Sequence, residues 1–152
     1  MMKLAEALAE RSDIRKKLDS LSGRLNNNVR VLEGEEPTED PKRLLKDLNV
    51  LIAREEELIC MIDIANANTV AANGEPLAAL LARRKALMDK VEILENLMRS
   101  AENSRNSYAS KDSPREIVTV NIPSLRKEAD ALSKEIRETD SLIQMTNWST
   151  DI

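Results

Sequence analysis

Two arginines interrupt helical rows of otherwise aliphatic residues, and they are the side chains best suited to chemistry. Arg11 and Arg84 each occupy a row position, spaced alternately by three and four residues, where an apolar residue is expected. A guanidinium can donate two parallel hydrogen bonds to a carboxylate or a phosphate, so two of them favour a site for a small anion. A buried charge without a partner is costly, so each arginine must meet a polar group in the folded protein.

Five further residues are expected near these arginines. If successive helices run antiparallel, counting along them brings all seven side chains to one end of the fold. Asn66 and Thr69 would add hydrogen bonds to an anion, and Trp148 would cover it. The predicted ligand-binding residues are Arg11, Asp63, Asn66, Thr69, Arg84, Asn147 and Trp148. The interpretation that we favour over such a pocket is that the arginines form structural salt bridges that fix the helix register, with Asp63, Glu10, Asp140 or a neighbouring subunit.

No catalytic residue, metal site or cofactor is predicted. The chain has no histidine, so its single cysteine, Cys60, lacks the base that a thiol nucleophile needs and is interpreted as a small residue on the apolar side of its helix. The acidic connector 33–41 lacks the alternating ligand spacing of an EF-hand and is interpreted as a solvated loop. A hydrolase using Glu10 and Asp63 would need their carboxylates within a few ångströms, which spacing cannot establish.

Four long helices are expected to carry these residues. Charged residues make up 33% of the chain, with only 3 glycines and 5 prolines, which is typical of long helices. Asp40 and Asn121 are predicted N-caps because a proline follows each closely, and Asn73-Gly74 predicts a turn. We therefore expect an all-α fold in a single domain, residues 1–152: an antiparallel up-down-up-down four-helix bundle with coiled-coil-like rows. The helices are expected at about 3–32, 42–71, 76–107 and 122–147.

The helix at 42–71 is expected to lie well inside the bundle. Its apolar residues form two adjacent rows, a stripe wide enough to contact more than one neighbouring helix. These residues are Leu45, Leu48, Ile52, Ile59 and Ile62, flanked by Leu44, Leu51, Leu58 and Ala65. Glu55 falls in the middle of the stripe and is expected at an edge facing water.

Residues 116–122 carry the strongest strand signal in the sequence. The run is β-branched, and its predicted interface residues are Ile117, Val118, Val120 and Ile122. A lone strand leaves its backbone groups unpaired. The segment is therefore expected either to pack over the bundle as an extended connector or to pair with its copy in a homo-oligomer.

Composition also restricts the classes of partner and compartment. The net charge of −4 and the scarcity of aromatic residues argue against nucleic acid, which requires a basic face and stacking platforms. No apolar run approaches the roughly 20 residues that span a bilayer. The charged N-terminus does not resemble a signal peptide, and a single cysteine suits a reducing compartment, so a cytoplasmic location is expected.

Several stretches resemble a family of small bacterial proteins labelled septicolysin-like, most of which have no assigned function. The resemblance is carried by Met2 to Leu8 with Arg11, Glu33 to Pro37 with Asp40-Pro41, Ile62 to Thr69, Arg83-Arg84, Glu116-Ile117, and Arg137 to Gln144 with Asn147 and Trp148. It implies a helical bundle and little chemistry. The label also implies a membrane-damaging toxin, but the helices alternate charges of both signs instead of presenting the basic polar face of a membrane-surface helix.

The sequence does not specify the physiological role. We expect a non-enzymatic protein that acts through self-association or partner binding. The alternative is a protein that binds a small carboxylate or phosphate in a polar pocket at one end of the bundle. A membrane-active lysin is the least favoured of the three.

Overall fold

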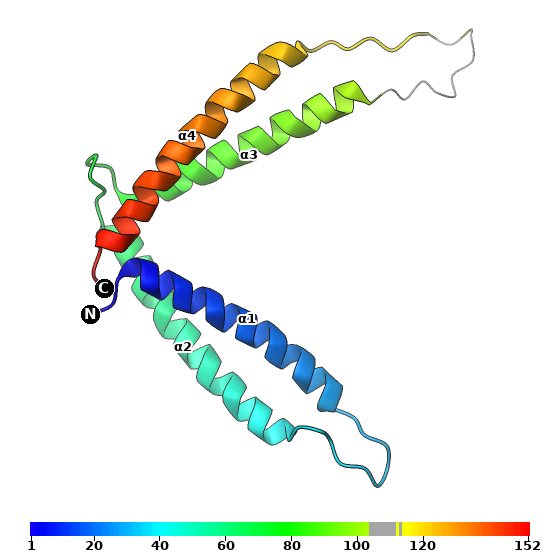
Figure 1. Cartoon of the computed structure of the whole chain (residues 1–152), viewed down its shortest axis with the longest axis vertical. Coiled ribbons are helices and arrows are strands. Elements are labelled where there is room, and N and C mark those ends of the chain that lie inside the picture. Colours follow the sequence, from blue (N-terminus) through cyan, green and yellow to red (C-terminus); the bar gives the residue numbers. More distant parts are fainter. Residues whose placement is uncertain (104–111, 113) are drawn as a thin grey trace. The chain divides into compact units, whose positions relative to one another are not determined.

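The computed structural model describes residues 1–103, 112 and 114–152, and these form an all-α fold (Figure 1). Its helices are α1 (Leu4–Asn28), α2 (Pro41–Asn68), α3 (Leu77–Glu102) and α4 (Ile122–Ser149). The predicted class and the four predicted helices are confirmed, and α1 packs against α2. The described residues contain no strand, so the extended segment predicted at 116–122 is not shown, and Ile122 already belongs to α4.

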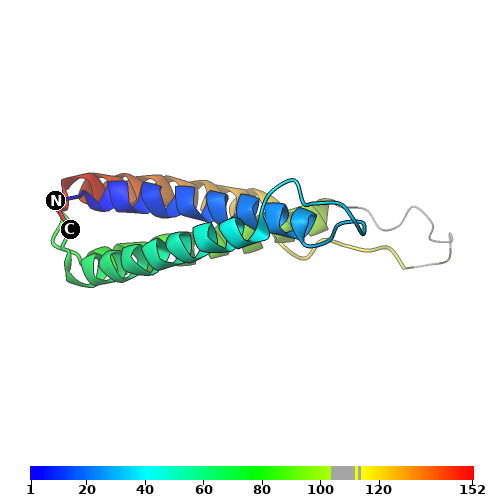
Figure 2. The ribbon, with the colours of Figure 1, turned by 90° about the horizontal axis from the view of Figure 1, so that it is seen from below.

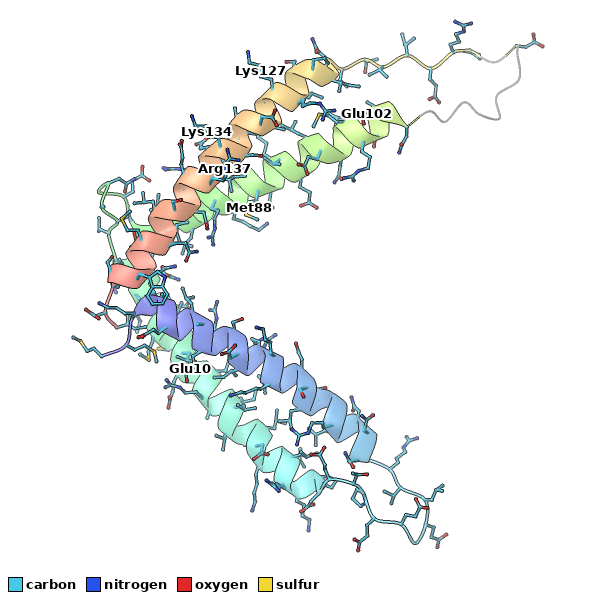
Figure 3. All side chains as sticks on the ribbon, in the orientation of Figure 1. Glu10, Met88, Glu102, Lys127, Lys134 and Arg137 are labelled. Atoms are coloured by element: carbon cyan, nitrogen blue, oxygen red, sulfur yellow. The ribbon has the colours of Figure 1, made fainter. Side chains whose placement is uncertain are left out.

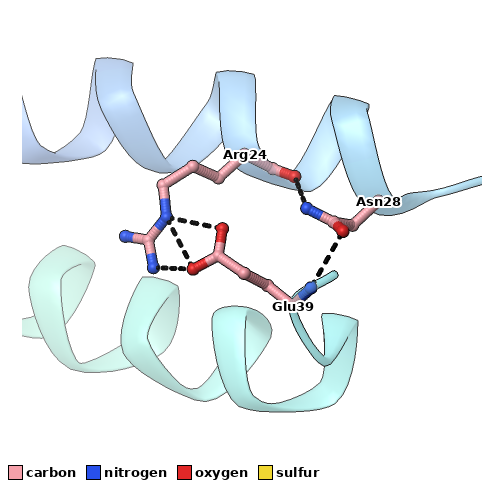
Figure 4. Close-up of polar contacts among 3 residues, drawn as sticks. All are labelled: Arg24, Asn28 and Glu39. Atoms are coloured by element: carbon pink, nitrogen blue, oxygen red, sulfur yellow. Dashed lines mark hydrogen bonds and ion pairs between the residues drawn. The ribbon is translucent and has the colours of Figure 1, made fainter. Parts of the chain in front are cut away.

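α1 ends at Asn28, four residues before its predicted end at Leu32. The side-chain amide of Asn28 donates to the carbonyl oxygen of Arg24 at 2.8 Å, and its Oδ1 accepts from the backbone N–H of Glu39 at 3.0 Å (Figure 4). The bond with Glu39 joins the last turn of α1 to the connector, so the chain leaves the helix there and Leu32 is exposed.

The other helix ends follow local capping chemistry. Asp40 accepts a hydrogen bond from the N–H of Lys42, with Pro41 in the first turn, which confirms the predicted N-cap of α2. α2 ends at Asn68, not near residue 71, because Val70 and Pro76 form an antiparallel bridge around a turn at Gly74, whose φ is 85°. Asn121 caps α4 through the N–H of Ser124. α3 is described as far as Glu102, and residue 107, where its end was predicted, lies outside the described residues.

The contacts divide the chain into two compact units. Unit 1 comprises Met1–Leu77 and Gln144–Ile152, and unit 2 comprises Ala78–Ile143. The prediction that residues 1–152 form a single domain stays a prediction.

Unit 1 is built on the antiparallel pair of α1 and α2, which lie side by side in Figures 1 and 2. A heptad-spaced row on α1 packs against a similar row on α2 and removes both from water. The buried apolar residues are Leu4, Ala7, Ile14 and Leu21 on α1, and Leu44, Leu58, Ile62 and Ala65 on α2. The two chain ends also meet here, since the backbone groups of Met2 and Ile152 exchange hydrogen bonds and Lys3 forms an ion pair with Asp151.

Only half of the wide apolar stripe predicted on α2 is buried. Leu45, Ile52 and Ile59 were expected in the core, but their exposed fractions are 49%, 46% and 40%. Each follows a residue of the inner row, Leu44, Leu51 or Leu58, and so lies about 100° further around the helix, away from α1. Glu55, expected to face water, is instead buried. Both expectations were wrong because α1 covers one side of the stripe and leaves the other open.

Unit 2 pairs α3 with the part of α4 that runs to Ile143. A buried cluster of Leu94, Met98 and Ala129 packs with the partly buried side chains of Ile122, Leu125 and Leu132. Ion pairs join the two helices along their length, including Lys90 with Glu128 and Arg126 with Glu102, which is labelled in Figure 3.

Candidate functional site

The residues predicted to bind an anion are distributed over both units. Arg84 belongs to unit 2, where its Nη1 lies 2.5 Å from Oδ1 of Asp140 on α4. This is one of the structural salt bridges that the sequence left open as an alternative. The other six predicted residues, Arg11, Asp63, Asn66, Thr69, Asn147 and Trp148, all belong to unit 1. The seven-residue anion pocket therefore stays a prediction.

Within unit 1 these six side chains differ in accessibility. Arg11 is half-buried and makes no ion pair with another described residue, and its neighbour Glu10 is bound by Arg54. Asn66 and Thr69 are half-buried, and Thr69 lines a hollow between α2 and the C-terminal tail. Asp63 is exposed, Asn147 is buried and Trp148 is 60% exposed, so the indole presents much of its surface to water.

The strongest polar contacts of unit 1 are ion pairs between its helices. Arg54 binds the carboxylate of Glu10 through two nitrogens, at 2.7 and 3.0 Å, and also Glu57. Arg24 binds Glu39 in the same forked manner (Figure 4). The hydrogen bonds from these guanidiniums hold the pKa values of Glu10 and Glu39 below the usual 4.5. Such mutual pairing is structural and leaves these groups little capacity for a ligand.

A third pair, between Arg15 and Glu55, occupies a different side of the helix pair. Nη1 of Arg15 lies 3.0 Å from Oε1 of Glu55, whose side chain is almost covered while the arginine is largely exposed. Arg54 and Glu55 are adjacent and lie about 100° apart on α2, so the two pairs flank the core row on opposite sides. The Arg15–Glu55 side is also the side of Leu45, Ile52 and Ile59.

Metal and thiol chemistry have no assembled site among the described residues. No group of three or more His, Cys, Asp or Glu side chains in that part of the chain could hold a metal ion. Cys60 was expected on the apolar side of α2 but is exposed, since it lies one position beyond Ile59 and further from α1. No helix of the described chain combines the length and apolar character needed to cross a membrane.

The four predicted interface residues before and at the start of α4 differ in their surroundings. Ile117 is 82% exposed, Val118 is exposed and Val120 is half-buried. Ile122 packs against the Leu94, Met98 and Ala129 cluster of its own unit. Pairing of this segment between subunits stays a prediction.

Comparison with known proteins identifies a family but no activity. A family model described as a family of unknown function, DUF6847, matches residues 11–152. The chain belongs to the DUF6847 family. It is also similar to a crystal structure described as a functionally unknown conserved protein from Corynebacterium diphtheriae, with 34% identity, a TM-score of 0.87, and coverage of 98% of this chain and 97% of that one. No curated protein matches the chain.

These findings correct the resemblance inferred from the sequence. The assignment to a septicolysin-like family was wrong, because the matching family is DUF6847 and neither it nor the Corynebacterium diphtheriae structure carries that label. Membership of DUF6847 brings no lytic activity with it, since the function of the family is unknown.

Sequence reasoning missed the exposed side of α2 as a candidate site. We call Leu45, Ile52 and Ile59 the outer row. Its residues are seven apart, and the row was visible in the sequence as part of the stripe. The sequence did not reveal which of the two rows α1 would cover.

Proposed function

We propose that this DUF6847 protein is non-enzymatic and acts by self-association, with the outer row of α2 as the contact surface. The proposal is carried by one observation: three large aliphatic side chains at seven-residue spacing are each 40–49% exposed on a well-packed helix. Seven-residue spacing is the pattern by which one helix recognises another. A second copy of the chain supplies the same row.

The free energy expected from burying the outer row fits a weak, concentration-dependent dimer. Full burial of one aliphatic side chain contributes about 1.5–3 kcal/mol, so covering its exposed half contributes roughly 0.7–1.5 kcal/mol. Six such side chains, three from each copy, contribute roughly 4–9 kcal/mol. This is comparable with the roughly 4–15 kcal/mol of lost translational and rotational freedom. Polar residues around the row, including Arg15 and Glu56, would form the rim of the contact.

Light scattering over a range of protein concentrations tests the proposal. Wild type is expected to approach twice its monomer mass of 17.1 kDa as the concentration rises. Ile52→Lys is expected to remain monomeric, because two lysines would meet at the centre of the contact. Val50→Lys is the matched control: Val50 is 69% exposed on the same helix but lies about 160° around it from Ile52. A wild type that stays monomeric at every concentration contradicts the proposal.

The segment before α4 is a second candidate contact. Its support is the exposure of Ile117 and Val118 in a β-branched run. Ile117→Lys and Val120→Lys are expected to lower the mass measured by light scattering if this run pairs between subunits. An unchanged mass would exclude it.

Anion binding is the alternative function, and it is supported by the half-buried guanidinium of Arg11, which has no ion pair among the described residues. Phosphates or carboxylates are then expected to raise the melting temperature, and Arg11→Leu to abolish the shift. Arg84→Leu is the comparison, since Arg84 already pairs with Asp140. A broad panel without any shift would contradict anion binding. The single cysteine supports a cytoplasmic location for either function.

A further inference from the structure

We infer that the second copy binds α2 in the antiparallel direction, with a twofold axis near Ile52. The inference rests on the proposed function and specifies its partner surface. The outer row is symmetric about its middle residue, since Leu45 and Ile59 each lie seven positions from Ile52. In an antiparallel pair centred there, Ile52 meets Ile52 of the partner subunit, and Leu45 meets Ile59 of the partner subunit.

A second row beside the first has the same centre. Its four residues are polar, exposed and also seven apart, and we call them the polar row: Lys42, Asn49, Glu56 and Asp63. Its midpoint falls between residues 52 and 53, within one residue of the centre of the outer row. At 1.5 Å per residue it extends over about 32 Å of the helix. A twofold contact is self-complementary, so residues equidistant from the axis on its two sides meet each other.

The charges of the polar row fit only the antiparallel direction. Flanking rows on the same side meet each other in an antiparallel pair, so Lys42 would lie beside Asp63 of the partner subunit, and Asn49 beside Glu56 of the partner subunit. Each pair is complementary, and the twofold axis produces each pair twice. Lys42 and Asp63 make no ion pair with another described residue of their own chain. In a parallel pair, the polar row of one copy would instead lie beside the side of the partner subunit's α2 that packs on α1.

Disulfide capture tests the direction of pairing. In a Cys60→Ala background, which removes the only native thiol, Ile52→Cys is expected to form a covalent dimer under mild oxidation. A mixture of Leu45→Cys and Ile59→Cys proteins is expected to form the mixed disulfide, whereas Leu45→Cys alone is not, because the bond requires Cα atoms within about 7 Å. Val50→Cys is the control for random collision. Circular dichroism checks that each variant keeps its helices.

The outcomes separate the direction of pairing from the proposed function. Self-linking by Leu45→Cys without the mixed product would overturn the antiparallel arrangement while self-association survives. If light scattering shows a dimer but none of these cysteine variants forms a disulfide, the contact lies elsewhere on the chain. That result would also overturn the inference. A wild-type chain that is monomeric throughout would remove both proposals.

Charge reversal gives a second, independent readout. Asp63→Lys sets two lysines beside each other at both ends of the contact and is expected to raise the dimer dissociation constant roughly tenfold. Adding Lys42→Asp restores the pairs with opposite polarity and is expected to recover the affinity of the wild type. A double variant no better than Asp63→Lys would contradict the pairing.

Discussion

Units 1 and 2 each contain a pair of long helices, but their core side chains are buried to different degrees. In unit 1 the buried apolar side chains between Leu4 and Leu21 on α1 and between Leu44 and Ile62 on α2 are 0–4% exposed. In unit 2 Leu80 and Ile143 are 1% exposed, whereas the buried residues Leu94, Met98 and Ala129 are 6–9% exposed. The tightest part of unit 2 therefore lies at the beginning of α3, and its packing loosens toward the end of that helix.

The connections account for part of this difference. In unit 1 a short connector is held by Asn28 and by the forked Arg24–Glu39 pair, which fix the far ends of α1 and α2 against each other. In unit 2 the corresponding ends carry the exposed pair Arg126–Glu102. Both ion pairs are exposed and contribute little to stability. What unit 1 adds is the hydrogen bond from the N–H of Glu39 to Asn28.

Truncation of matched core leucines should give the largest difference between the units. Leu58 is 0% exposed and Leu94 is 9% exposed. Leu58→Ala is expected to lower the free energy of unfolding by about 2–5 kcal/mol, and Leu94→Ala by clearly less, because its site is already open at one side. Denaturant titration with a helix signal measures both. Equal losses would show that the two cores are equally tight.

Removing the partner of the buried glutamate should have the next largest effect. Arg15→Ala leaves the Glu55 carboxylate covered without a counter-ion, and is expected to cost about 1–3 kcal/mol. The counterpart in unit 2, Asp140→Ala, removes a half-exposed partner of Arg84 and should cost less than 1 kcal/mol. Glu55→Leu is expected to be neutral or stabilising, since it extends the apolar row. A strong loss from Glu55→Leu would assign the pair an essential structural role.

The connector of unit 1 can be tested at Asn28. Asn28→Ala removes the hydrogen bond from the N–H of Glu39 to the end of α1 and the bond that Asn28 donates to Arg24, and is expected to lower the free energy of unfolding by about 1 kcal/mol. Amide hydrogen exchange should become faster in the last turn of α1 and remain unchanged in α3. If exchange in α1 were unaffected, Asn28 would not be the residue that holds this connector.

Lowering the pH is expected to have the smallest of these effects on stability, and it should act on unit 1. Glu10 and Glu39 have pKa values below 4.5 in the folded protein because arginines bind their charged forms. A lowered pKa contributes stability above the unfolded value, and this stability is lost as the pH falls through the folded value. The melting temperature should therefore decline below about pH 4.5. Glu10→Gln with Glu39→Gln should flatten this decline, whereas an unchanged pH profile would contradict it.

The sequence predicted the all-α class, the four helices and two of the caps because these depend on local spacing. The row through Leu4, Ile14 and Leu21 on α1 and the cap at Asp40 are examples. It did not predict which side of α2 would be covered, because that depends on how α1 packs against α2 and not on the spacing within α2. The early end of α1 was missed for a similar reason, since Asn28 bonds to a backbone group eleven residues away.

The proposed site shows the same limit. Arg84 was correctly recognised as a charge that needs a partner, and Asp140 was one of several partners left open. Helix spacing could not choose among them, because the choice depends on which helix packs beside α3. The outer row of α2 was counted as core, although exposure on a folded surface is what makes it a candidate contact.

The most direct measurement is sedimentation equilibrium of wild type, Ile52→Lys and Val50→Lys at matched concentrations. We expect wild type and Val50→Lys to approach twice 17.1 kDa with increasing concentration, and Ile52→Lys to remain at the monomer mass with the melting temperature of dilute, monomeric wild type. Equal masses for all three proteins would contradict self-association through the outer row. An unfolded or strongly destabilised Ile52→Lys monomer would also contradict it, because the row would then be covered within its own chain.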